Sequence, residues 1–336
     1  MKMKNFNKPG IFLVLSFFFL LLVGVITLFI GSEKVEFREV FHHVFQHPTV
    51  DGQIFFQVRL PRILLAILTG ATLSLAGLVF QALLRNPLAT PYTLGVSSGG
   101  ALGAVLMFKL GLDLNFLGFS TVQTAAFLGS LTTVTLVYLL ASRSGRISIY
   151  TMILAGVTVS YFFGAVILMV HYFADFTETR NMIRWMMGGL DISGYRELVS
   201  SSVLIFPVVI VLFYHARMLN IVSTSHDTAL SKGVSVGKVQ RVVFVGASLI
   251  TGMAVAISGP IGFVGLIIPH FLRLSIGVDH RYLIPASLMV GGAFLTLCDT
   301  LARTLLAPVD IPVGIITAIL GGPFFLWLLM KRKGEM

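Results

Sequence analysis

Segments of about 20 mostly apolar residues recur along this chain, separated by short polar breaks, and this recurrence limits the fold more than any other feature. A helix needs about 20 such residues to cross a bilayer, so each segment predicts a membrane-spanning helix. Composition agrees, because the 336 residues are 56% hydrophobic and 11% charged, with a mean hydropathy of +0.93. We therefore predict an all-α polytopic membrane protein with about ten spans, forming a single transmembrane domain over residues 1–336.

The predicted spans cover residues 11–30, 63–84, 92–110, 121–141, 152–173, 197–216, 241–258, 261–277, 283–303 and 312–330. The first is longer than the apolar core of a signal peptide, and Gly31, Ser32 and Glu33 after it provide no cleavage motif, so we expect it to be retained. Pro269 interrupts the eighth segment and is expected to kink that helix rather than abolish it.

The distribution of charge predicts the orientation. If the N-terminus is inside, the inner segments hold 15 of the chain's 24 Lys and Arg residues and only three acids, as the positive-inside rule requires. Both termini are then cytoplasmic. The net charge of +10 is spread between apolar runs instead of forming a basic patch, which argues against a nucleic-acid partner. A single cysteine, Cys298, allows neither an internal disulfide nor a cysteine metal cluster.

The outer segment 33–58 has the apolar spacing of an amphipathic helix lying along the outer membrane face. Its stripe is Phe37, Val40, Phe41, Val44 and Phe45. The polar side carries His42, His43 and His47, a spacing that also suits a shared metal ion, although a solvated face is the simpler interpretation.

The inner segment 217–241 is too polar to insert, yet its apolar spacing predicts a short helix-turn-helix on the cytoplasmic face. Such a surface suits docking of a soluble partner, and a solvated connector is the alternative. Gly233 to Lys238 resembles a phosphate-binding loop, but the spacing is one residue short and no Ser or Thr follows the lysine. If ATP drives this protein, the hydrolase is therefore a separate chain.

Small residues within the spans indicate how the helices pack, and ionisable residues there indicate whether transport is coupled to ions. Gly70, Ser74 and Gly77 lie on one helix face, and Gly95, Gly99 and Gly103 repeat every four residues, so both sets predict close helix packing. Ionisable groups at membrane depth are few, which argues against an ion-coupled carrier. Asp299 and Arg303 lie one helical turn apart and are expected to pair with each other.

The motif RLPR places Arg59 and Arg62 on either side of Pro61, at the predicted outer mouth of the second span. The positive-inside rule does not place arginines there. Two arginines in fixed register suit bidentate pairing with the carboxylates of a docked protein. Snorkelling to lipid headgroups is an equal alternative from these residues alone.

Several motifs are spread from about Arg59 to Lys331: RLPR at 59–62, QALLRNPLATPYTLGVSSGGALGA at 81–104, LAGV at 154–157, GPIGFVGLIIPHFLR at 259–273, DHR at 279–281 and IPVGIITAILGGPFFLWLL at 311–329. Taken together, they resemble the permease subunits of type II ABC importers for iron-siderophores, haem and cobalamin, the FecCD-type iron-complex transport family. The resemblance implies ten transmembrane helices per subunit and a dimer of identical or related permeases in the cytoplasmic membrane. Two cytoplasmic ATPases, which bind ATP and Mg, and an extracytoplasmic binding protein are the implied partners.

The resemblance also implies roles for individual residues. The residues implied to dock the binding protein are Arg59, Arg62 and Arg303, the last in LARTLLAP. Those implied to couple to the ATPase are Leu219, Asp227, Ala229 and Gly233. Those implied to form the cytoplasmic gate are Ser148, Ile149 and Tyr150. The coupling segment departs from the family pattern, since only Asp227 keeps an acid. No residue is expected to be catalytic or to hold a metal or cofactor. A ferric siderophore is the expected cargo, and haem or cobalamin is the alternative.

Overall fold

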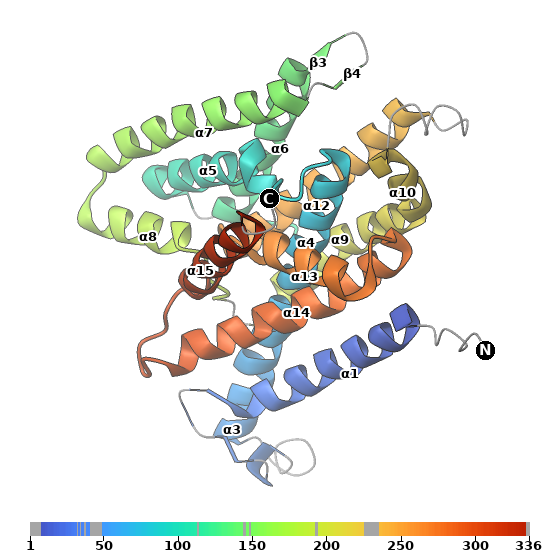
Figure 1. Cartoon of the computed structure of the whole chain (residues 1–336). Coiled ribbons are helices and arrows are strands. Elements are labelled where there is room, and N and C mark those ends of the chain that lie inside the picture. The colour runs from blue at the N-terminus through green and yellow to red at the C-terminus, as the bar shows by residue number, and fades with distance from the viewer. Residues whose placement is uncertain are drawn as a thin grey trace, which may run out of the picture.

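The computed structural model describes residues 8–31, 33, 35–36, 38–40, 49–112, 114–143, 146–147, 149–191, 194–224 and 235–333. The helices are α1 (Lys8–Phe29), α3 (Val50–Gln53), the π-helix η1 (Ile54–Arg59), α4 (Leu60–Leu83), the 3-10 helix η2 (Pro91–Leu94), α5 (Val96–Leu110), α6 (Thr121–Ala141), α7 (Ile149–Tyr172), α8 (Phe176–Met186), α9 (Arg196–Tyr214), α10 (Ala216–Thr224), α12 (Val236–Ser258), α13 (Val264–Ile276), α14 (His280–Thr304) and α15 (Val313–Lys333). Most run roughly side by side, with α8 at the left and α10 at the right of Figure 1.

Seven of the described helices are long and apolar enough to cross a membrane, and three shorter apolar helices accompany them, at Val96–Leu110, Val264–Ile276 and Val313–Leu326. Each of these helices coincides with one of the ten predicted spans. The fold is thus an all-α polytopic membrane bundle, as the sequence predicted. Helix α13 continues through Pro269, so the proline does not abolish the eighth helix.

Two short antiparallel hairpins connect helices. Strand β1 (Asn115–Phe116) pairs with β2 (Phe119–Ser120), with Asn115 opposite Ser120. Between them Leu117 and Gly118 both have positive φ, 49° and 92°, as a tight two-residue hairpin turn requires. Strand β3 (Ser142–Arg143) pairs with β4 (Arg146–Ile147) between α6 and α7.

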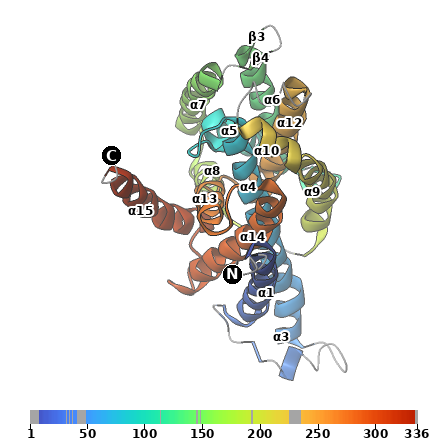
Figure 2. The ribbon, with the colours of Figure 1, turned by 45° about the vertical axis from the view of Figure 1, so that its right-hand side comes forward.

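Helix α4 lies in the middle of the bundle (Figure 2) and packs against α14, α12 and α13. In the apolar 18-residue stretch of the continuous helix Val50–Leu83, 78% of the residues are buried within the protein, against 17% in the corresponding stretches of α1 and α7. A helix surrounded by other helices needs apolar or small residues on every side. Helices α1 and α7 instead turn most of their surface outward, towards lipid or another chain.

Glycines set the spacing of α4 from its neighbours. A Cβ added at Gly70 would lie 2.3 Å from the carbonyl oxygen of Gly291 in α14, and one at Gly77 would lie 1.9 Å from that of Gly265 in α13. Backbones this close exclude any larger side chain. The predicted close packing of this small face is confirmed. The same holds for Gly99, where a Cβ would lie 2.4 Å from the Gly129 oxygen in α6.

The second membrane helix begins earlier than predicted. Thr49 caps α3 by accepting a hydrogen bond from the Gly52 N–H, and α3, η1 and α4 then run on as one helix through residue 83. Residues 50–58, which the sequence analysis assigned to the outer amphipathic segment 33–58, are therefore continuous with the second membrane helix. Of the predicted apolar stripe, only Val40 lies in the described part of the chain, and the three histidines lie outside it.

The π-helix η1 is supported by the segment before α9. Tyr195 donates its hydroxyl to the Phe56 carbonyl at 2.6 Å, and the Gly194 N–H donates to the Gln57 carbonyl at 3.1 Å. The hydrogen bonds of a π-helical turn differ from those of an α-helix. The Tyr195 hydroxyl and the Gly194 N–H supply outside donors to two carbonyls of this turn. The contact brings the connection before α9 close to Arg59 and Arg62.

Helix α8 is an element that the sequence analysis did not predict. It begins with a capping box in which Asp175 and Glu178 each accept a backbone N–H from the other. Lys109 at the end of α5 holds it through an ion pair with Glu178 at 2.8 Å. This contact lowers the pKa of Glu178, chiefly through the hydrogen bond from Lys109.

The predicted cytoplasmic segment 217–241 contains a helix, α10, as expected for its first half. The following residues 225–234 lie outside the described part of the chain, and α12 already begins at Val236. The segment therefore starts with a helix that packs against α4, α14, α9 and α12.

Candidate functional site

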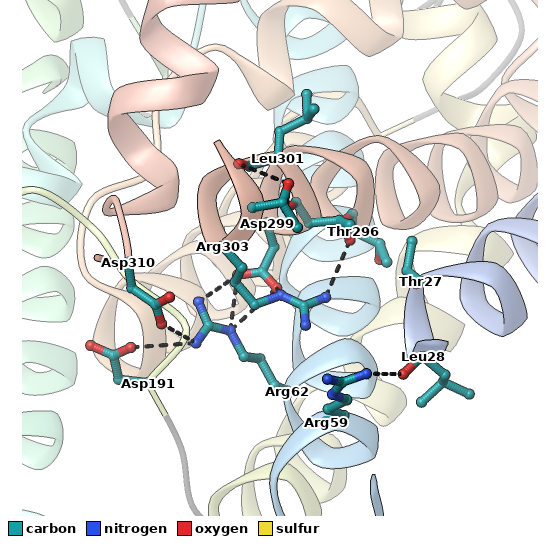
Figure 3. Close-up of polar contacts among 12 residues, drawn as sticks. Thr27, Leu28, Arg59, Arg62, Asp191, Thr296, Asp299, Leu301, Arg303 and Asp310 are labelled. Atoms are coloured by element: carbon teal, nitrogen blue, oxygen red, sulfur yellow. Dashed lines mark hydrogen bonds and ion pairs between the residues drawn. The ribbon is translucent and has the colours of Figure 1, made fainter. Parts of the chain in front are cut away.

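Arg62, in the first turn of α4, lies at the centre of a group of charged residues near the C-terminal end of α14 (Figure 3). Its Nη2 and Nε lie 3.0 and 3.1 Å from Oδ1 of Asp299. Its Nη1 lies 3.0 Å from Oδ2 of Asp310 and 3.9 Å from Oδ1 of Asp191. One guanidinium thus joins α4, α14 and the segments that precede α9 and α15.

Asp299 is shared between two arginines. Arg303 Nε lies 3.1 Å from Oδ2 of Asp299, so the pairing predicted from their four-residue spacing is confirmed. Asp299 is fully buried and Arg303 is 6% exposed. Buried charges of this kind are stable only when they are paired, and here one carboxylate compensates two guanidinium groups.

Arg59 belongs to the same region but uses different partners. It lies in the last turn of η1, is 4% exposed, and donates from Nη1 to the Leu28 carbonyl at 3.0 Å and from Nη2 to the Glu33 carbonyl. A Cβ added at Gly31 would meet Arg59 Nη2 at 2.9 Å and Arg303 Nη1 at 3.4 Å. Gly31 therefore lies beside both guanidinium groups, and any larger residue there would press on them.

The structure brings the three predicted docking arginines together. We call Arg59, Arg62, Arg303, Asp299, Asp310 and Asp191 the arginine network. Its buried part carries three guanidinium groups and one carboxylate, Asp299, while the side chains of Asp310 and Asp191 are 40% and 52% exposed. Counted together, the three guanidinium groups and three carboxylates have no net formal charge, and the excess of positive charge is confined to the buried part. Arg62, with 13% of its side chain exposed, is the arginine that borders the surface.

The opposite ends of α4 and α14 meet α10. Leu219, predicted to contact the ATPase, is 1% exposed and lies in the hydrophobic core with Val222 and Ala216. Its side chain holds α10 against the bundle, so a contribution to coupling would act through the position of α10. Asp227, Ala229 and Gly233, the other predicted coupling residues, lie outside the described residues.

Polar groups also fix α10. Asn220 contacts Asp279, which caps α14, and Arg85 after α4 reaches the Val222 carbonyl. Arg281 donates to the Asp279 carboxylate at 2.6 Å and lowers its pKa, with a further contribution from Asn220. The sequence analysis did not identify Asn220 or Arg85. The polar loop in which Asn220 lies was the only signal.

The predicted gate residues lie at the start of α7. Ser148 is outside the described residues, Ile149 begins the helix, and Tyr150 is 89% exposed. Towards the other end of α7, a pocket of about 630 Å³ lies between α7 and α8. Its wall is almost entirely apolar and includes Leu168, His171, Met186 and Met187. Among the residues that the structure describes, no group of three His, Cys, Asp or Glu side chains lies close enough together to hold a metal ion.

Comparison with known proteins identifies the family. The model of the FecCD transport family matches residues 19–331. The hemin transport system permease protein HmuU of Yersinia pestis is 37% identical over 319 residues, covering 94% of this chain and 95% of the relative. The cobalamin import system permease protein BtuC of Halobacterium salinarum is 41% identical over 278 residues, covering 82% and 73%. The iron(3+)-hydroxamate import system permease protein FhuG of Bacillus subtilis is 35% identical over 340 residues, covering 99% and 100%.

A solved structure gives the same result at the level of the fold. An inward-facing metal-chelate type ABC transporter superposes with a TM-score of 0.84 at 34% identity, covering 96% of this chain and 99% of that one. The bundle described above is therefore the permease fold of type II ABC importers. On the family match and these relatives, the chain belongs to the FecCD transport family.

Proposed function

We propose that this chain is the membrane-spanning permease subunit of an ATP-driven, binding-protein-dependent importer that carries an iron complex across the cytoplasmic membrane. The observation that carries the proposal is the pair α4 and α14, which ends in the arginine network on one side and in α10 on the other. A permease of this kind needs one surface for a binding protein and another for an ATPase. Membership of the FecCD transport family supports the same assignment.

The proposed orientation has both termini in the cytoplasm. The segments that the positive-inside rule places inside include Arg85, Arg217 and Arg281, and the structure gathers them around α10. Arg62, Asp191 and Asp310, which fall on the outer side, gather in the arginine network. This separation of the two sets supports the proposed orientation.

The proposed partners follow from this orientation. A binding protein docks outside at the arginine network, where Arg62 borders the surface and Arg59 and Arg303 are buried. Two ATPase chains, which hold ATP and Mg, dock inside against α10 and the residues that follow it. A second permease, identical or related, covers the outward-facing side of α7. The largely unburied apolar surface of α7 supports this last placement.

The proposed mechanism is alternating access. Closure of the ATPase dimer moves α10, and the helices packed against it change the access of a central path. The permease supplies that path and no bond chemistry. A wide path with an apolar lining, such as that of the pocket between α7 and α8, suits a large chelate. Such a lining binds the chelate weakly, whereas tight binding would slow its release.

A ferric siderophore is the proposed cargo. One relative, which this chain covers from end to end, is named for an iron(3+)-hydroxamate, and this supports the cargo. Haem is the second candidate, because the pocket between α7 and α8 presents His171 and two methionines, the side chains that often hold haem iron. Uptake of labelled ferric siderophore, haem and cobalamin, with and without the chain, decides between them. Loss of ferric siderophore uptake alone supports the assignment, and loss of haem uptake alone replaces it.

A further inference from the structure

Helix α10 is attached to both central helices of the bundle, and a different residue makes each attachment. Arg85, just past the C-terminal end of α4, donates to the Val222 carbonyl from Nε at 3.0 Å and from Nη2 at 2.7 Å. Asn220 contacts the residues at the N-terminal end of α14. These contacts do not depend on the packing of Leu219, so α10 has polar anchors in addition to an apolar one.

The Asn220 side chain uses both ends of its amide. Its Nδ2 donates to Oδ1 of Asp279 at 2.7 Å, and its Oδ1 accepts the His280 N–H at 2.9 Å. The Nδ1 of His280 also lies 2.6 Å from this oxygen, which places its proton on Nδ1. Only a side chain with a donor and an acceptor side by side makes this set of contacts. Neither aspartate nor alanine does so.

The partner of Asn220 is itself held in place. Asp279 caps α14 by accepting the Arg281 N–H at 3.0 Å, and the Arg281 guanidinium donates to its other oxygen at 2.6 Å. Its carboxylate is thereby kept charged and oriented, and it remains an acceptor for Asn220. The contact of α10 with α14 is therefore made to a fixed group.

The Arg85 contact has a similar character. The Val222 carbonyl lies in the last turn of α10, where helix carbonyls lack an intrahelical donor. A cation at this end also interacts favourably with the helix dipole. Arg85 adopts a positive φ of 48°, which turns the chain after α4 towards α10.

Helices α4 and α14 are also joined at their other ends, by Arg62 and Asp299. The 24 residues of α4 span about 36 Å at 1.5 Å per residue. The three helices thus form a closed frame, in which α10 bridges α4 and α14 at one end and the Arg62–Asp299 ion pair bridges them at the other.

We propose that Asn220 is a positioning residue that, with Arg85, makes α10, α4 and α14 one rigid unit. When α10 is displaced, α4 and α14 then move with it, and the arginine network at the far end of α4 moves as well. Without this attachment, α10 would move relative to the bundle and the network would stay in place. That α10 is displaced by an ATPase rests on the proposed function. The rigid attachment itself does not.

Hydrogen exchange on the purified full-length chain tests the attachment. Asn220→Ala is expected to speed exchange of the amides of residues 216–224 about tenfold, the effect of losing a buried polar contact. Ser223→Ala is the matched control, because the Ser223 hydroxyl donates to the Asn220 carbonyl within α10, at 3.0 Å, and this bond does not join α10 to α14. Wild-type exchange over residues 216–224 in Asn220→Ala would overturn the proposal.

An exchange of partners distinguishes this specific contact from general damage. Asn220→Asp sets two carboxylates against each other and is expected to speed exchange as much as Asn220→Ala does. Adding Asp279→Asn removes this like-charge contact, but the Asp279 oxygen that meets Asn220 also accepts the Arg281 N–H, so slow exchange should return only in part. Wild-type exchange over residues 216–224 in Asn220→Asp contradicts the assigned contact.

Transport measurements test the consequence. In proteoliposomes that contain the permease, its ATPase and the binding protein, Asn220→Ala should carry about tenfold less cargo per ATP hydrolysed, while the ATPase still co-purifies. An unchanged ratio in Asn220→Ala overturns the proposal. If the wild-type complex shows no ATP-driven uptake, the proposed function fails together with the coupling role, whereas the exchange experiment decides the attachment independently.

Discussion

Arg62 and Asp299 lie 237 positions apart in the chain and form a two-point ion pair, with the Nη2 and Nε of Arg62 at 3.0 and 3.1 Å from Oδ1 of Asp299. The pair ties the start of α4 to the end of α14. Because the same carboxylate also holds Arg303, it compensates two guanidinium groups in a buried place. The stability of this end of the bundle therefore depends strongly on Asp299.

Replacing Asp299 by Ala is expected to destabilise the protein by about 3–5 kcal/mol, because it leaves Arg62 and Arg303 without their buried partner. Thermal or denaturant unfolding of the purified chain in detergent measures this. Lys109→Ala, which removes the more exposed ion pair with Glu178, is the control and should cost less than about 1 kcal/mol. An Asp299→Ala protein as stable as Lys109→Ala would contradict the assigned role.

The local part of this site could be predicted from the sequence, and the long-range part could not. The spacing of Asp299 and Arg303 follows from the helical repeat, and their pairing was predicted. Nothing in the pattern around Arg62 shows that it meets the same carboxylate, since tertiary packing alone brings α4 and α14 together.

The fold shows the same division. Apolar length predicted the spans, and glycine spacing predicted the close approach of α4 to its neighbours. The short helix α8 was missed because it is too polar and too short for a span, although Asp175 and Glu178 form a capping box that marks its start. Asn220 was missed because an asparagine in a polar loop has no distinguishing pattern until its partners, Asp279 and His280, are known.

Changing both Arg59 and Arg62 to Glu is expected to weaken docking of the binding protein at least about tenfold at moderate salt, because attraction to its carboxylates becomes repulsion. Binding of the purified partner to the reconstituted permease measures the effect. Arg180→Glu, an exposed reversal on α8, is the surface control and should change docking little. Because reversal at Arg62 also sets a carboxylate against Asp299 and Asp310, unfolding of the double variant in detergent is measured alongside docking. Unchanged docking in the double variant, with the protein still inserted and folded, would refute the docking role.

Gly77→Ala is expected to destabilise the bundle by about 1–3 kcal/mol or to block folding, because the added methyl meets the Gly265 carbonyl. Gly164→Ala in α7 is the control, since a Cβ there has no heavy atom within 4 Å. Unfolding of both variants in the same detergent provides the comparison. Equal stability of the two would mean that α4 and α13 do not pack as closely as described.

The contact of Asn220 with Asp279 should be insensitive to pH from 8 to 5. The pKa of Asp279 is lowered in the folded protein, mainly by the Arg281 hydrogen bond, so its contribution is fully present above the unfolded pKa of about 3.9. That contribution is lost only as the pH falls below this value, towards the folded pKa. Exchange over residues 216–224, corrected for intrinsic rates, measures it, and loss of protection between pH 8 and 5 would contradict the assignment.

The most direct test of the central claim is uptake of labelled ferric siderophore by cells with and without this chain, with ATP and the proton gradient varied independently. An ATP-driven importer permease predicts uptake that requires the chain, persists when the gradient is collapsed at constant ATP, and stops when ATP is depleted. Uptake that requires the chain but follows the proton gradient at constant ATP would show an ion-coupled carrier instead and would contradict the account.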